Sequence, residues 1–433
     1  MFLFQILAIA VGFTSFATAF DPQLGFNSFV EVETRSLDEI YQAALKEGGT
    51  LTVWHGGDEK TQQNGLKTAF EARFPGMTLN ITVDLSKYHD INVDQQIATD
   101  SVYVDSVILQ TLHDFPRWKS QGALLPYKPS GYDNIYPAFK DVDAYHMGLF
   151  IIGWSNTFNT KFLNSSVPIE YTDFLKPEFK DKLVLTYPND DDAVLYQFDL
   201  IMKQYGYGWF EALLVQNPRW VRGTATPATL VRSSNSTYAA TFTSSIGLFP
   251  SSPLNISHPV EGQFVTWPQT GAILKNAPHP ESAKLLHSFI LSPEHQNATG
   301  SWSVRNDVAP PAGYPSIMEM PGTNPTKFSE WMMDRAAVER LRFFFETRIG
   351  SAQGLSPLID DLPISFPDLT ILAEKYGHPT GTGHEAISYQ YPLKSGLTPL
   401  RNPPFDTYQE SLDFLEEETY QRQRLSGSKH AIP

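Results

Sequence analysis

Helical and strand patterns alternate through the first part of the chain. Between residues 36 and 120 the sequence reads helix, strand, helix, strand, helix, strand and helix. Three short segments carry the strand signal: TLTVW (50–54), MTLNITV (77–83) and VDSVIL (104–109). Alternation of this kind predicts an α/β fold with helices on both faces of a sheet. Because such sheets bind ligands at the carboxyl ends of their strands, the residues after each strand are the first candidates for a site.

The first two helices are marked by capping and amphipathic signals. Ser36 is a good N-cap, Asp38 and Glu39 suit the positive end of a helix, and a Gly-Gly pair ends that helix. A second helix is predicted over residues 58–74, where apolar residues recur on one face.

A second α/β unit is expected after residue 145. Its predicted elements are a strand at 147–154, a helix, turn and strand at 171–186, a helix closed by Gly206, a strand pair and helix at 264–292, and one long helix at 326–349. The strand pair and helix have no unit of their own, so we expect the chain to return to the first unit there.

Both ends of the chain read differently from the rest. Residues 1–19 form an apolar stretch too short to span a membrane and end in Ala-Thr-Ala, which predicts a cleaved secretory signal. Residues 377–433 are turn-rich and end in one acidic helix, so we expect an irregular, loosely attached tail. Five Asn-x-Ser/Thr sequons predict a glycoprotein from a eukaryotic secretory route: Asn80, Asn164, Asn235, Asn255 and Asn297.

Composition narrows the classes of partner. The formal charge of −15 argues against nucleic acid and anionic membrane surfaces, since both require clustered Lys and Arg. Cysteine is absent, which excludes thiol catalysis and cysteine-ligated zinc, and a chain of 433 residues can build adequate cores without disulfides. No later segment is apolar enough to insert into a membrane. We therefore expect a small-molecule or ion ligand and no cofactor.

The order of elements resembles a known family, the extracellular solute-binding proteins with the periplasmic binding protein type II fold. It is most similar to those of ferric-iron ABC importers, and the sequons and signal suggest a eukaryotic, fungal secreted branch. The resemblance covers about residues 36–376 and is carried by LTVWHGGDEKTQQNGLKTAFEARFPGMTLNI (51–81), DSVIL (105–109), DFLKPEFKDKLVLTYP (173–188) and TGAILKNAPHPESAKLLHSFILSPEHQ (270–296).

This resemblance implies two discontinuous lobes with a ligand cleft between them, a geometry suited to hinge closure. The implied first lobe comprises residues 36–145 and 260–312, and the second comprises 146–259 and 313–376. The resemblance implies ligand binding without covalent chemistry. Members of the family deliver their ligand to a membrane transporter, but the sequence does not identify such a partner.

The resemblance also bears on the metal. In the iron-binding branch, a histidine, a glutamate and two adjacent tyrosines hold the ion; the aligned positions here are Asp58, Gln110, Ser245 and Ile246. Ferric iron requires anionic oxygen donors, and the loss of both phenolates removes most of them.

The segment after the first strand, His55 to Glu59, is the first candidate rim of the cleft. Asp58 and Glu59 lie where the second helix should begin, so they either cap that helix or contact a ligand. His55 is either a hydrogen-bonded structural residue or a ligand contact, and Gly56 belongs to the same turn.

The segment YPNDDDAVLY (187–196) is the second candidate. The predicted start of a helix here holds three consecutive aspartates, Asp190, Asp191 and Asp192. In the family that this chain resembles, backbone N–H groups at this helix start often bind an anion. Three carboxylates would repel an anion, so this segment favours a cationic ligand: a metal ion, an amine or a thiamine-like compound. The alternative is that one aspartate caps the helix and two are solvated.

Further candidates follow other strands. Trp220, Arg222 and Thr224 lie in a loop expected to face the cleft, where Arg222 either contacts ligand or neutralises the aspartates. Three other tryptophans, Trp54, Trp154 and Trp267, either pack in the core or stack on a ligand, and we select Trp267 as a site residue.

Enzymatic motifs are weak. There is no Gly-x-Ser-x-Gly elbow or Walker loop, and His384-Glu385 lacks the second histidine of a zincin. The sequence therefore predicts a secreted, non-enzymatic solute-binding protein. The alternative is a secreted hydrolase that uses cleft carboxylates such as Asp58 and Asp191 as acid and base.

Overall fold

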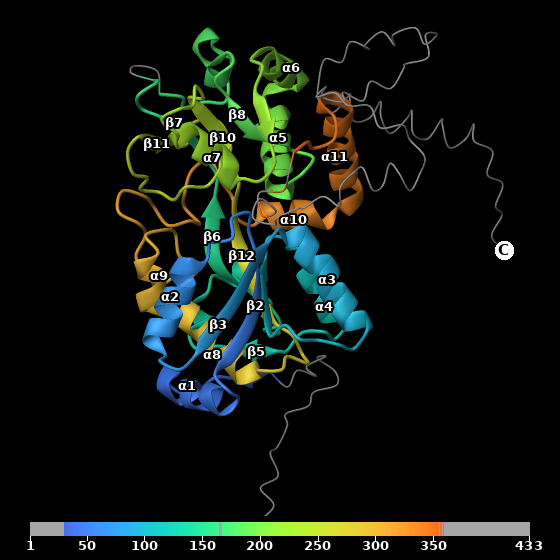
Figure 1. The fold of residues 1–433 in the computed structure, drawn as a ribbon, viewed down its shortest axis with the longest axis vertical. Coiled ribbons are helices and arrows are strands. Elements are labelled where there is room, and N and C mark those ends of the chain that lie inside the picture. Colours follow the sequence, from blue (N-terminus) through green and yellow to red (C-terminus); the bar gives the residue numbers. More distant parts are fainter. Residues whose placement is uncertain (1–29, 164–166, 355, 357, 359–433) are drawn as a thin grey trace, which may run out of the picture.

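The computed structural model describes residues 30–163, 167–354, 356 and 358. The predicted signal, the predicted tail and the sequon at Asn164 lie outside the described residues. The described chain forms two α/β lobes that follow one another along the long axis (Figure 1). This confirms the predicted fold class.

The first lobe is built on a five-stranded sheet in the order β3-β2-β4-β12-β6. Its strands are β2 (Thr50–Gly56), β3 (Thr78–Asp84), β4 (Ser106–Leu109), β6 (Met147–Gly153) and β12 (Thr266–Ile273). Strands β2, β3 and β4 are parallel, whereas β12 runs antiparallel to both β4 and β6. The short strands β1 (Glu31–Val32) and β5 (Tyr127–Lys128) pair separately.

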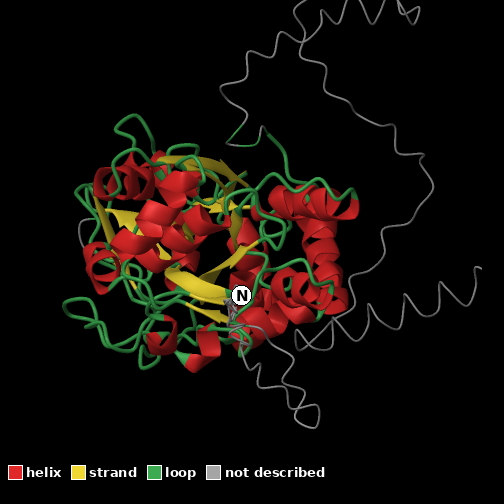
Figure 2. Ribbon diagram, turned by 90° about the horizontal axis from the view of Figure 1, so that it is seen from below, coloured by secondary structure: helices red, strands yellow, loops and turns green. Residues whose placement is uncertain are grey.

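Helices lie on both sides of this sheet (Figure 2). They are α1 (Leu37–Lys46), α2 (Asn64–Arg73), α3 (Ser86–Ala98), α4 (Asp114–Ser120), α8 (Pro280–Ile290) and α9 (Pro293–Ala298). Ser36 caps α1 through a capping box with Glu39, as its sequence predicts. The chain thus returns to this lobe through β12 and α8.

The second lobe combines a three-stranded antiparallel sheet, β10-β7-β11, with the parallel pair β8-β9. Its strands are β7 (Ser155–Asn159), β8 (Val184–Thr186), β9 (Arg219–Val221), β10 (Ala240–Ser244) and β11 (Leu254–Ser257). Its helices are α5 (Asp192–Tyr205), α6 (Tyr207–Val215), α7 (Ala225–Arg232), α10 (Lys327–Met333) and α11 (Arg335–Ile349). Aromatic residues of α5, α6 and α11 form much of its core.

The lobes are joined where β6 runs into β7 and where the chain enters β12. Trp154 separates β6 from β7, and its backbone N–H donates to the carbonyl oxygen of Val265 at 3.0 Å. The rings of Trp154 and Trp267 meet edge to face with centroids 5.3 Å apart. Both tryptophans are buried in the core of the second lobe, so side chains are closely packed at the junction between the lobes.

Three predicted elements differ from the structure. The helix predicted at 58–74 begins only at Asn64. The segment 171–186 holds two 3₁₀ turns in place of an α-helix, because Lys176 precedes a proline and is extended. The segment 264–292 contains the single strand β12 where a strand pair was expected.

The long helix predicted at 326–349 is also wrong. It is divided into α10 and α11 at Asp334, which has non-helical backbone angles of φ −86° and ψ 72°. The Asp334 carboxylate accepts from the N–H of Ala337 and so begins a new helix. This break sets the direction of α11, which carries Arg342 to the junction between the lobes.

Candidate ligand-binding cleft

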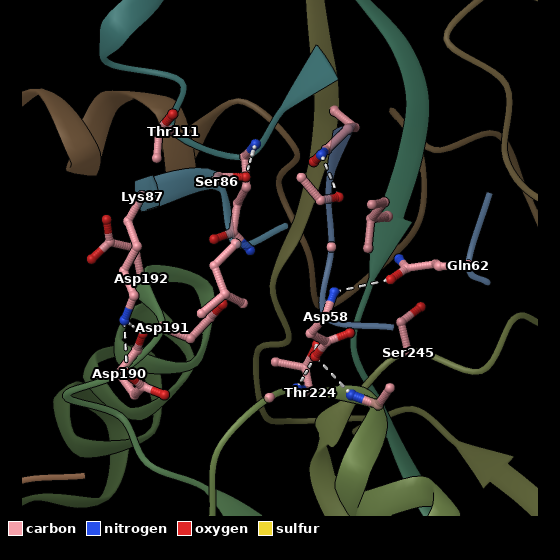
Figure 3. Close-up of a pocket in the computed structure, with 18 of the residues that line it drawn as sticks. Asp58, Gln62, Ser86, Lys87, Thr111, Asp190, Asp191, Asp192, Thr224 and Ser245 are labelled. Atoms are coloured by element: carbon pink, nitrogen blue, oxygen red, sulfur yellow. Dashed lines mark hydrogen bonds and ion pairs between the residues drawn. The ribbon is translucent and has the colours of Figure 1, made fainter. Parts of the chain in front are cut away.

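A cavity of about 210 Å³ lies between the two lobes (Figure 3). Its lining comes from the loops after β2, β3 and β4 in the first lobe and from the starts of α5 and α7 in the second. Among the predicted site residues, those that line it are Gly56, Asp58, Gln110, Asp190, Asp191, Asp192, Thr224 and Trp267. Two predicted site residues, His55 and Arg222, are not among the lining residues.

Asp58 reaches from the first lobe to the start of α7 in the second. Its Oδ2 atom accepts from the Thr224 hydroxyl at 2.8 Å, from the Ala225 N–H at 2.9 Å and from the Thr224 N–H. The capping interpretation is therefore wrong for its own helix, since α2 begins six residues later. Asp58 instead caps a helix of the opposite lobe, where the free N–H groups and the helix dipole stabilise a carboxylate.

Asp190 is neutralised by two basic side chains. Lys87 Nζ contacts its Oδ1 at 2.7 Å, and Arg222 Nε donates to its Oδ2 at 2.9 Å. Burial raises the pKa of Asp190, but the hydrogen bonds from Arg222 and Lys87 outweigh burial and hold it below its usual value. Arg222 also donates to the Tyr88 hydroxyl at 3.2 Å. Because Lys87 and Tyr88 belong to the first lobe, these contacts are a second polar link across the cleft.

Asp192 is also paired. Arg342 Nη2 donates to its Oδ1, and Arg335 Nη1 lies 3.4 Å from its Oδ2. Both arginines lie on α11, more than 140 residues further along the chain, so their pairing with Asp192 could not be predicted from neighbouring residues in the sequence. Two of the three consecutive aspartates are thus compensated inside the second lobe or across the cleft.

Asp191 is different because no Lys or Arg of the described chain pairs with it. Its Oδ1 accepts from the N–H groups of Ala193 and Val194, both at 2.9 Å, and so caps α5. Burial raises the pKa of Asp191 to about 6, and the nearby carboxylates of Asp192 and Asp58 act in the same direction. Asp58 and Asp191 line the cavity from opposite lobes and have no basic partner among the described residues. Glu59, at the exposed rim, also lacks one in the described chain.

His55 and Trp54 belong to the first-lobe core. His55 is 1% exposed, and its Nδ1 donates to the Gly56 carbonyl oxygen at 2.8 Å. Burial lowers the pKa of His55 to about 4, so the ring is neutral at pH 7. Trp54 stacks on His89 with ring centroids 4.9 Å apart. Their environment therefore agrees with a hydrogen-bonded structural role for His55 and with core packing for Trp54.

Gly56 allows a close approach between two strand ends. A Cβ atom at Gly56 would lie 2.0 Å from Ser86 Oγ, which accepts a 3.0 Å hydrogen bond from the Gln110 N–H. The loops after β2, β3 and β4 thus meet at one point, and the absence of a side chain at Gly56 is what permits it.

Several lining residues were not selected from the sequence: Gln62, Ser86, Lys87, Thr111, Trp154, Ser245 and Arg342. Ser86, Lys87 and Thr111 follow the ends of strands β3 and β4. The strand-end rule, by which such sheets bind ligands at the carboxyl ends of their strands, could therefore have identified them. Of the positions aligned with iron ligands, Asp58, Gln110 and Ser245 line the cavity, whereas Ile246 packs against a small apolar cluster. Within the described residues, no group of three or more His, Asp or Glu side chains is arranged to hold a metal ion.

The Gly56 contact predicts a sharp steric effect. Gly56→Ala should displace Ser86, break its hydrogen bond with Gln110 and destabilise the fold by about 1–3 kcal/mol in denaturant unfolding. Gly65→Ala is the matched control, because no atom beyond its chain neighbours and its own helix backbone lies within 4 Å of the added Cβ, and alanine favours the helix. Equal effects of the two substitutions would contradict the close packing described at Gly56.

The raised pKa of Asp191 predicts a pH-dependent gain in stability for Asp191→Asn. Asparagine is also a good N-cap, but it does not ionise. Below about pH 4 both proteins carry a neutral group, so their stabilities should be similar. Between pH 4 and pH 6 Asp191 ionises in the unfolded state but stays protonated in the folded state, so above pH 6 the wild type has lost about 3 kcal/mol of stability that the variant keeps. Unfolding measured from pH 4 to pH 7.5 tests this; a difference independent of pH would contradict it.

Comparisons with known proteins bear on the fold of this cleft. Residues 109–300 match the family model described as bacterial extracellular solute-binding protein. No curated protein matches the chain by sequence. Among solved structures, the substrate-binding protein of an ABC transporter from Agrobacterium tumefaciens is similar, with 13% identity and a TM-score of 0.58, covering 69% of this chain and 93% of that one.

Two further structures share the fold. AfuA from Actinobacillus pleuropneumoniae, solved with fructose-6-phosphate, has 16% identity and a TM-score of 0.55 over 70% of this chain and 99% of its own. Iron-bound HitA from Pseudomonas aeruginosa has 16% identity and a TM-score of 0.52 over 68% and 99%. The matched family and these neighbours are binding proteins, not enzymes. The chain therefore has the two-lobe fold of periplasmic binding proteins, and its central part is similar to the bacterial extracellular solute-binding family.

Proposed function

We propose that this chain is a secreted, non-enzymatic solute-binding protein that holds a small cationic ligand in the cleft between its lobes. The observation that carries the proposal is the pair of carboxylates, Asp58 and Asp191, that line the cavity from opposite lobes without a basic partner in the described chain. A cation between them would contact both lobes at once and so would favour the closed arrangement.

Each of the two carboxylates has one oxygen held by a helix start and one left open. The donors from α7 all reach Oδ2 of Asp58, and those from α5 reach Oδ1 of Asp191. The remaining oxygens have no hydrogen-bond partner among the described residues. They are suited to accept from a protonated amine, and a bound cation would also relieve the repulsion that helps to raise the pKa of Asp191.

An organic cation fits better than a bare metal ion. Calcium sites in proteins usually combine several carboxylates with backbone and water oxygens. Among the described residues, no group of three or more His, Asp or Glu side chains is arranged to hold a metal ion. The cavity of about 210 Å³ also has room for more than an ion. An amine or a compact thiamine-like compound therefore agrees best with the site.

Anionic ligands are disfavoured by the same carboxylates. The starts of α5 and α7 would attract an anion, but Asp191 and Asp58 already accept from their N–H groups. A phosphate such as that of the sugar phosphate bound to AfuA would meet these charges. The two positions aligned with iron-binding tyrosines hold Ser245 and Ile246, so we also do not extend the iron binding of HitA to this chain.

Secretion and glycosylation are part of the proposal. The predicted signal supports export, and the four sequon asparagines within the described residues, Asn80, Asn235, Asn255 and Asn297, are all exposed. In the described part of the chain, no helix meets the length and hydropathy needed to cross a bilayer. We assign no transporter partner.

A hydrolase that uses the same carboxylates is the second candidate. The pKa of about 6 at Asp191 is the observation that favours it, since a general acid needs a proton near neutral pH. Turnover of a polysaccharide substrate, abolished by Asp191→Asn with the fold intact, would support this candidate over simple binding.

The proposed function predicts charge-selective binding. Calorimetric titration with a panel of small amines should find saturable ligands, and Asp191→Asn should weaken them by about tenfold, or 1.4 kcal/mol. Affinity for the wild type should rise between pH 5 and pH 7.5, because the proton on Asp191 competes with the cation below its pKa of about 6.

Glu59→Gln is the matched control for this titration. It removes one negative charge from the cavity rim. Because the Glu59 side chain is exposed and its carboxylate accepts from the Thr61 hydroxyl, the substitution should leave affinity within about twofold of the wild type. Equal losses in both variants would show a diffuse charge effect. Saturable binding of small anions and of no amine would contradict the proposal.

A further inference from the structure

We propose that the ligand also carries a neutral oxygen that accepts a hydrogen bond from the indole N–H of Trp154. The ligand class is then a small amine that also bears a hydroxyl or carbonyl group. This inference rests on the proposed function and specifies the other end of the same ligand.

Trp154 is a buried donor without an acceptor. Its side chain lines the cavity at the junction of β6 and β7 and is only 3% exposed. Its Nε1 atom is buried and has no hydrogen-bond partner in the described chain. An indole N–H can only donate, and buried donors in native proteins are nearly always paired. An oxygen on a ligand in the adjoining cavity would supply the missing acceptor.

Trp267 provides an internal comparison. It lines the same cavity, packs edge to face on Trp154 at 5.3 Å and is equally buried. Its Nε1, however, donates to Gln269 Oε1 at 2.9 Å. The fold therefore satisfies one of two adjacent indoles with its own side chain and leaves the Trp154 N–H without an acceptor among the described residues.

A second unpaired group lies on the first-lobe wall. Thr111 follows β4, is 4% exposed and lines the cavity, and its hydroxyl has no hydrogen-bond partner in the described chain. Figure 3 draws Thr111 and Asp58 in separate parts of the lining, on the loops after β4 and β2. The unpaired neutral groups of Trp154 and Thr111 thus belong to other segments of the lining than the unpaired carboxylates of Asp58 and Asp191.

The charge of the cavity lining favours a neutral oxygen on the ligand over a carboxylate. Carboxylates at Asp58, Glu59 and the aspartate triplet outnumber the two basic lining residues, Lys87 and Arg342. Those two are already paired with Asp190 and Asp192. A ligand carboxylate would therefore find no free cation among the described lining residues, whereas a neutral hydroxyl or carbonyl needs only the N–H of Trp154.

Two probes with the same four-carbon chain test this inference: 4-aminobutan-1-ol and butylamine, titrated into the full-length protein. Both present the amine, but only the first has an oxygen. We expect the amino alcohol to bind about tenfold more tightly, with the difference lost in Trp154→Phe, which keeps an aromatic ring but removes the N–H. Trp267→Phe is the matched control and should retain the difference.

The outcomes separate this inference from the proposed function. Equal affinity of the two probes for the wild type, or a tenfold difference that persists in Trp154→Phe, would overturn the inference and leave the cation site intact. Failure of both probes to bind would count against the cation site itself. If Trp154→Phe does not fold, the wild-type comparison of the two probes still decides.

Unfolding temperatures give a readout without ligand. Both Trp→Phe substitutions lose similar packing, but only Trp267→Phe also leaves Gln269 without its donor. We therefore expect Trp154→Phe to lower the unfolding temperature less than Trp267→Phe. The opposite order would show that the Trp154 N–H is already satisfied within the protein, and would overturn the inference.

Discussion

The contact between Asp58 and the start of α7 determines how the two lobes meet. One carboxylate oxygen from the first lobe accepts three donors at a helix start of the second. The Lys87–Asp190 pair and the Arg222–Tyr88 hydrogen bond lie beside it and also join the lobes. Such helix-start contacts are normally made within one domain, and here one connects two.

This arrangement changes the meaning of the acidic segments. As a pattern, five carboxylates around one cavity indicate a strongly negative site. In the structure Asp190 and Asp192 are paired with Lys and Arg, and Glu59 lies at the exposed rim. The charge left for a ligand is therefore localised on Asp58 and Asp191. A localised pair of opposed carboxylates selects for a small cation with more precision than a diffuse acidic surface.

Much of the first lobe could be predicted from its sequence because its signals are local. The cap at Ser36, the alternating residues of β3 and the apolar strand β4 each identify an element within a few residues. The strand-end rule then brought Asp58 and Gln110 to one cavity. Strand β6 was predicted in the second lobe but pairs with β12 in the first-lobe sheet. The predicted lobe boundaries otherwise remain a prediction.

The rest of the site depends on contacts between distant segments. Arg342 reaches Asp192 from 150 residues away, and Asp58 reaches Thr224 from 166 residues away. No local pattern encodes either contact. The late start of α2 and the break at Asp334 both involve an aspartate that caps a helix other than the predicted one. Asp58 caps α7 in place of α2, and Asp334 caps α11 within a segment that was predicted as one helix.

The most direct measurement is the identity of small molecules released when the natively purified protein is denatured, determined by mass spectrometry. The account predicts a stoichiometric amine bearing a neutral oxygen, present with the wild type and absent from a protein in which Asp58 and Asp191 are both replaced by asparagine. Release of an anionic compound, or of the same compound from both proteins, would contradict it.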